Sequence, residues 1–217
     1  MPMTRMGALS GLLAVAMLCG AFATSVAAHP HVWIVFQATV LHDNGAFVGV
    51  RYKWTFDEFY TAMAIEGLDK NKDGIYDREE LSELAKVNMD GLKEFAYFTY
   101  PALAGKELKV GEARDYWLEH KDGELSLYFT LPFPSPVLVE AKGLTVSVYD
   151  PTYFIAFEPA KTDPAKLSEG APKACVAKIG VPPQKSGEGA ELESLQAQLG
   201  ALGVSIAKTI MVDCSGR

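Results

Sequence analysis

The sequence predicts an α+β protein, mainly antiparallel β-sheet in a sandwich-like arrangement, with an inserted helix–loop–helix unit. Short segments alternate apolar and polar residues, as strands with one buried face do. Turn-forming residues separate these segments. The regular alternation of strand and helix that a parallel α/β fold requires is absent from the sequence.

The first two strands are predicted over residues 31–41 and 48–56, joined by the turn-forming residues 42–45. Each strand carries apolar residues at every second position. We expect one buried face for this hairpin, made of Val32, Ile34, Phe36, Ala38 and Val40 from the first strand and Val48, Val50, Tyr52, Trp54 and Phe56 from the second.

An EF-hand-like insertion is predicted over about residues 57–93. Residues recur at helical spacing before its central loop (Phe59, Ala62, Met63) and after it (Leu81, Leu84, Ala85, Asn88, Leu92), and all of them except Asn88 are apolar. The chain therefore leaves the sheet, forms two helices and returns.

The loop between these helices, residues 69–80, fits the calcium-loop pattern D-x-[DN]-x-[DN]-G-x5-E. Gly74 supplies the sharp turn, and hard oxygen ligands select a hard cation. The expected Ca²⁺ ligands are the side chains of Asp69, Asn71, Asp73, Asp77 and Glu80 and the backbone carbonyl of Ile75. Tyr76 departs from the pattern, which usually has a branched aliphatic residue there. The alternative is an acidic turn that binds nothing.

The remaining strands are predicted over residues 95–103, 114–120, 125–131, 144–149 and 153–157. Pro132, Pro134 and Pro136 are expected to interrupt the strand pattern, and residues 159–172 to form a polar loop. Residues 29–180 thus form a β-rich domain. The tail, residues 181–217, is expected to hold a linker (182–189), a short helix (191–199) and a final strand (209–212).

Residues 1–28 have the features of a signal peptide. Arg5 precedes the apolar run 7–23, and Val26-Ala27-Ala28 has the small residues of a cleavage site. We expect a periplasmic protein of 189 residues with no transmembrane segment. Loss of Arg5 changes the formal charge from −7 to −8, which argues against a nucleic-acid partner.

Cys175 and Cys214 remain after such cleavage, and in an oxidising compartment they are expected to form a disulfide. This bridge would tie the tail to the β-rich domain. A pair of thiolate metal ligands is the alternative.

The expected mature amino terminus offers the α-amine and ring of His29 and the ring of His31, nitrogen donors that suit nickel, cobalt, copper or zinc. Pro30 has no N–H and excludes the familiar amino-terminal copper and nickel chelate. The alternative is two solvated histidines; His42 and His120 are weaker candidates. Common catalytic motifs are absent from the sequence, so an enzyme is not expected.

Four segments resemble successive blocks of the bacterial domain-of-unknown-function family one thousand and seven: residues 29–33, 54–59, 69–80 and 149–154. The family is labelled the periplasmic component of an uncharacterised ABC-type transport system and is associated with NicO-type nickel/cobalt permeases. The resemblance implies a metal-binding accessory protein for an inner-membrane permease or ABC transporter. The alternative is a calcium-stabilised envelope protein that docks on a partner and has no transport role.

Overall fold

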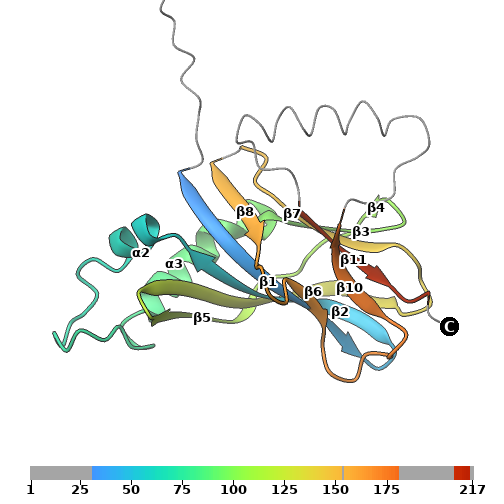
Figure 1. The fold of residues 1–217 in the computed structure, drawn as a ribbon, viewed down its shortest axis with the longest axis horizontal. Helices are drawn as coiled ribbons and strands as arrows, with labels where there is room; N and C mark the ends of the chain where they lie inside the picture. Colours follow the sequence, from blue (N-terminus) through green and yellow to red (C-terminus); the bar gives the residue numbers. More distant parts are fainter. Residues whose placement is uncertain (1–30, 153, 181–207, 216–217) are drawn as a thin grey trace, which may run out of the picture.

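The computed structural model describes residues 31–152, 154–180 and 208–215, which form two β-sheets around one core with the helical insertion at one end (Figure 1). The first sheet has the strand order β5-β6-β2-β1-β8, with β9 also paired to β1, and the second has the order β10-β11-β7-β3-β4. The α+β, sandwich-like fold predicted from the sequence is therefore confirmed.

The strands in chain order are β1 (Val32–Asp43), β2 (Ala46–Phe56), β3 (Thr99–Leu103), β4 (Lys106–Glu107), β5 (Arg114–Lys121), β6 (Glu124–Leu138), β7 (Leu144–Val148), β8 (Ile155–Pro159), β9 (Ala165–Leu167), β10 (Val176–Gly180) and β11 (Lys208–Asp213). The helical elements are α2 (Glu58–Ala64), α3 (Ser82–Lys93) and the short turn η1 (Ala96–Phe98).

The β1–β2 hairpin carries the buried face expected of it, with one exception. Phe36 lies opposite Trp54, and both side chains are buried. Val48 is only half-buried, because the pairing of β2 with β6 is interrupted between Phe47 and Gly49. This irregularity changes which side chains face inward, so Phe47 enters the core instead of Val48.

Two strand predictions were wrong. β6 continues through Pro132, Pro134 and Pro136, because its ladder with β2 passes from the Gly49–Pro132 pair directly to the Phe47–Val137 pair. Proline has no N–H to donate to a ladder, and the interruption of the ladder in this part of β6 accommodates this lack. The expected polar loop at 159–172 contains β9, which pairs in parallel with β1, as β8 does.

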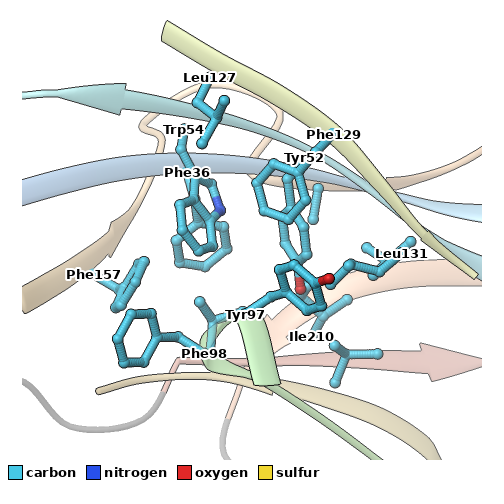
Figure 2. Packing of buried hydrophobic residues seen from close by; sticks show 14 of the residues in the cluster. Phe36, Tyr52, Trp54, Tyr97, Phe98, Leu127, Phe129, Leu131, Phe157 and Ile210 are labelled. Atoms are coloured by element: carbon cyan, nitrogen blue, oxygen red, sulfur yellow. The ribbon is translucent and has the colours of Figure 1, made fainter. Parts of the chain in front are cut away.

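Aromatic side chains fill the space between the sheets (Figure 2). The ring of Trp54 meets Phe129 at 4.8 Å, edge to face, and Phe157 at 4.9 Å. Tyr52 lies beside them, and burial raises the pKa of its hydroxyl. Burial of this much apolar surface is the main stabilising contribution to the fold.

Helix α2 presents a different face from the one predicted. Phe59 and Met63 are 75% and 58% exposed, whereas Thr61 is buried and its hydroxyl accepts a hydrogen bond from the backbone N–H of Leu125 (3.3 Å). The N-cap residue Asp57 fixes this orientation, because its carboxylate accepts from Trp33 N (2.8 Å) and Tyr60 N (2.9 Å). The helix is thereby fastened to the hairpin with Phe59 and Met63 facing outward.

The predicted strand 95–103 begins only at Thr99. Before it, Ala96, Tyr97 and Phe98 have left-handed backbones, with φ of 51°, 53° and 48°. Each costs about 1–2 kcal/mol for a residue with a Cβ. The turn places the side chains of Tyr97 and Phe98 in the core, whose packing offsets this cost.

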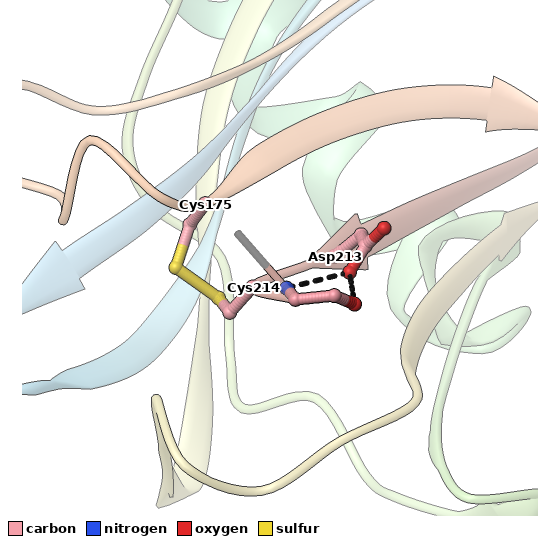
Figure 3. Close-up of a disulfide and its surroundings, with 4 residues drawn as sticks. Cys175, Asp213 and Cys214 are labelled. Carbon is pink, nitrogen blue, oxygen red and sulfur yellow. Dashed lines mark hydrogen bonds between the residues drawn. A yellow bond between two sulfur atoms is a disulfide. The ribbon is translucent and has the colours of Figure 1, made fainter. Parts of the chain in front are cut away.

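The Cys175–Cys214 disulfide predicted from the sequence is present (Figure 3). It joins the residue before β10 to the residue after β11, and these strands pair antiparallel. The predicted final strand 209–212 lies within β11. The predicted signal peptide, linker and helix 191–199 lie outside the described residues.

Candidate functional site

The candidate site is the acidic loop 69–80 between α2 and α3. Its carboxyl end is anchored in the core, because Leu81 is fully buried and is followed on α3 by the buried side chains of Ala85 and Met89. Helix α3 also packs along β5. The loop therefore projects from a fixed base.

The first half of the loop folds around the carboxylate of Asp69. This group accepts hydrogen bonds from Asp73 N (3.2 Å) and Gly74 N (3.0 Å), and Asn71 Oδ1 accepts a second bond from Asp73 N (2.9 Å). Gly74 has a φ of +79°, a conformation that glycine adopts without steric cost. The glycine required by the sequence pattern thus occupies the left-handed turn expected of it.

The second half of the loop is closed by Glu80, which is 9% exposed. Its Oε1 accepts from Lys70 N (2.8 Å) and its Oε2 lies 3.4 Å from Asp77 N. Asp77 in turn accepts from the backbone N–H groups of Glu79 (2.8 Å) and Glu80 (2.9 Å). The last carboxylate of the pattern therefore spans the beginning and the end of the loop.

This donor set suits a hard divalent cation, because its oxygens come from carboxylates and an amide on one short loop. In the described ranges, however, no three His, Cys, Asp or Glu side chains are gathered closely enough to hold a metal ion. The carboxylates are bonded to backbone N–H groups instead. A bound cation would require some of them to turn from these N–H groups toward a common centre.

Two further loop residues attach the loop to the sheet. The ring of Tyr76 meets His120 of β5 edge to face at 4.9 Å, and the guanidinium of Arg78 lies 4.6 Å from the ring centre of Trp117. Trp117 stacks on Tyr128 at 4.7 Å with nearly parallel rings. Sequence reasoning missed these contacts; the unusual aromatic residue at the eighth loop position was the only signal.

The hydroxyl of Tyr128 donates to Glu119 (2.9 Å) on the same face of the sheet. Burial, and next this hydrogen bond and the negative charge of Glu119, raise the pKa of Tyr128 to about 12. The stacked ring of Tyr128 covers one side of Trp117.

The histidines are not brought together. His31 is exposed, its ring packs 4.8 Å from that of Phe154, and its backbone N donates to Phe154 O (2.9 Å). His29 lies outside the described residues. His42 packs beside Phe47, and its Nε2 is buried with no partner in the described part of the chain. His120 packs against the loop, so neither it nor His42 joins His31.

These features define a two-sheet sandwich with a helix–loop–helix insertion whose connecting loop is acidic. Residues 14–214 match the family described as "Protein of unknown function (DUF1007)", and the chain belongs to this family. It is 27% identical to an uncharacterized protein of Haemophilus influenzae, over 91% of this chain and 97% of that one. It is 33% identical to an uncharacterized 15.5 kDa protein of Spirochaeta aurantia, over 46% of this chain and 70% of that one. Within the described ranges, no helix is long and apolar enough to cross a membrane.

Proposed function

We propose that this is an exported, non-enzymatic metal-binding protein whose loop 69–80 binds Ca²⁺. The side chains of Asp69, Asn71, Asp73, Asp77 and Glu80 and the carbonyl of Ile75 would hold the ion. The observation that carries the proposal is the position of the Glu80 carboxylate, which reaches the amides at the start of the loop. A glutamate at the end of the pattern must reach this far to close the coordination shell.

The proposed calcium site has a structural role. A sensor EF-hand separates its helices when calcium binds, but here Leu81 is fully buried and Arg78 and Tyr76 contact β5. Separation of α3 from the sheet would expose this core surface, so we expect no opening. Extracellular modules bind calcium with dissociation constants of about 10⁻⁴–10⁻³ M, which suits stabilisation in the envelope.

Thermal denaturation with and without calcium tests this role. We expect calcium to raise the melting temperature of the wild type and to leave that of Glu80→Gln unchanged. Glutamine can still accept from Lys70 N, so the variant should fold without calcium. Glu79→Gln is the matched control, since Glu79 is the exposed neighbour and not an expected ligand; it should respond like the wild type. An equal calcium response in Glu80→Gln would refute the site.

Transition-metal handling for a membrane permease is a second candidate. Its support is the His29-Pro30-His31 segment and the exposed ring of His31. Metal analysis of the mature protein after loading with nickel, cobalt, copper or zinc tests it. Stoichiometric metal that is lost in His29→Ala is the expected result. Retention of the same metal in that variant would exclude a site built on His29.

A further inference from the structure

A groove with a volume of about 370 Å³ lies between α2, α3, the start of β1 and the segment before β8. We call it the α3 groove. Its floor includes Ile34 and Phe98, and Val87, Phe95 and Phe154 line it with side chains that are 57%, 47% and 52% exposed. Several large, partly exposed apolar side chains around one groove are typical of a binding site, whereas an ordinary protein surface exposes such side chains singly. None of the loop residues 69–80 lines it.

Gly91 lines the same groove, and no packing contact among the described residues requires a glycine there. Its backbone is helical, and a Cβ built there meets no atom within 4 Å. A helical glycine destabilises by roughly 0.5–1 kcal/mol relative to alanine. A glycine at this position allows the backbone of another segment to approach the helix closely, because it has no side chain.

Asn88, one turn before Leu92, contributes a polar group with an unmet hydrogen bond. Tyr60 Oη donates to its Oδ1 (3.3 Å), while its Nδ2 is buried and has no acceptor among the described residues. A buried donor without an acceptor costs free energy. A small rotation of this side chain would present the N–H to a carbonyl inside the groove.

The charge of the lining restricts the occupant. Lysine and arginine are absent from the described lining, so an anionic lipid headgroup would find no counter-charge. The carboxylate of Asp150 is already saturated by Thr152 and by the backbone N–H groups of Phe154 and Ile155. A neutral apolar segment with backbone carbonyls fits this surface better than a charged ligand.

We propose that the α3 groove docks an apolar peptide segment of another protein. The segment crosses α3 at Gly91, buries its side chains against Val87, Phe95 and Phe154, and offers a backbone carbonyl to Asn88. This interaction surface is independent of calcium binding at the loop.

Peptide selection on the purified mature protein tests the proposal. A phage-displayed library of short random peptides would be panned on the wild type, and the affinities of the enriched peptides would be measured by fluorescence anisotropy. Gly91→Trp fills the groove at its glycine, and Val87→Lys places a charge on its wall. Asp90→Trp is the matched control, because Asp90 is exposed on the same helix and is absent from the lining. Circular dichroism would verify that each variant is folded.

We expect enriched peptides to be apolar, to bind wild type and Asp90→Trp alike, and to lose about tenfold or more in affinity for Gly91→Trp and Val87→Lys. Failure to enrich apolar peptides would overturn the proposal. Equal binding to Gly91→Trp would also overturn it. So would a groove that rejects peptides but binds a fluorescent fatty acid in a Gly91-dependent way, since the occupant would then be a lipid.

Discussion

Gly49 and Gly91 are both glycines inside regular elements, but only Gly49 is required by the protein's own packing. A Cβ on Gly49 would lie 2.5 Å from the backbone oxygen of Leu131 on the neighbouring strand β6, whereas a Cβ on Gly91 meets nothing. Neither residue has a positive φ. The close approach of the β2 and β6 backbones therefore requires a glycine at position 49. At position 91 no described neighbour requires one, and the glycine makes α3 less stable than alanine would.

These glycines give opposite predictions for stability. Gly49→Ala should lower the free energy of unfolding by about 1–3 kcal/mol, because a sheet backbone must shift to admit the methyl group. Gly91→Ala should raise it by roughly 0.5–1 kcal/mol. Urea denaturation measures both, and each variant serves as the other's control. A stable Gly49→Ala protein would mean that β2 and β6 are farther apart than described.

Among the helices and strands, the sequence predicted the elements that have a simple repeating pattern of apolar residues or a known loop motif. Alternation located β1 and β2, and the calcium-loop pattern located the insertion. Prediction from the sequence failed where contacts with distant parts of the chain determine which face of an element is buried or how the backbone turns. Thr61 faces inward because Asp57 orients α2, and the left-handed turn at Ala96–Phe98 is maintained by core contacts of Tyr97 and Phe98. The N-cap at Asp57 is local, but its bond to Trp33 N and the core contacts of Tyr97 and Phe98 are not visible in a local pattern.

The contact between the loop and β5 leads to a spectroscopic prediction. Calcium that orders the loop should change the environment of Arg78 over Trp117, so tryptophan emission should respond to a calcium titration. Trp117→Phe should abolish most of this response. Trp33→Phe is the control, since Trp33 is exposed on β1, which β6 and β2 separate from β5. If the emission change persists in Trp117→Phe, it does not come from the contact between Arg78 and Trp117, and the prediction is wrong.

For the whole molecule, the second sheet depends on chain segments far apart in sequence. β11 lies between β10 and β7, and the described chain reaches it only after residues 181–207. The disulfide closes this connection, with a sequence separation of 39 residues. Cysteine parity was enough to predict the bridge, but the position of β11 inside the sheet depends on long-range pairing that sequence reasoning could not supply.

Removal of the bridge should destabilise the whole fold. On the chain-entropy account, the Cys175→Ser/Cys214→Ser variant should lose about 4 kcal/mol of unfolding free energy. Chemical denaturation would measure this loss. A reductant should lower the stability of the wild type and leave the double variant unchanged. If both proteins unfold at the same denaturant concentration, the bridge contributes nothing to the stability of the native fold.

The candidate site was only partly predictable for the same reason. The ligand pattern lies within twelve consecutive residues and is visible in the sequence, as is the glycine at its turn. The attachment of Tyr76 and Arg78 to His120 and Trp117 joins residues about forty positions apart. Whether the loop acts as a fixed support or as a switch depends on this attachment.

Isothermal titration calorimetry of the mature, chelator-stripped protein tests calcium binding most directly. Calcium should bind with a stoichiometry of one ion per chain and a dissociation constant of about 10⁻⁴–10⁻³ M, and Glu80→Gln should give no binding heat in this range. Absence of binding heat from the folded wild type at millimolar calcium would contradict the account.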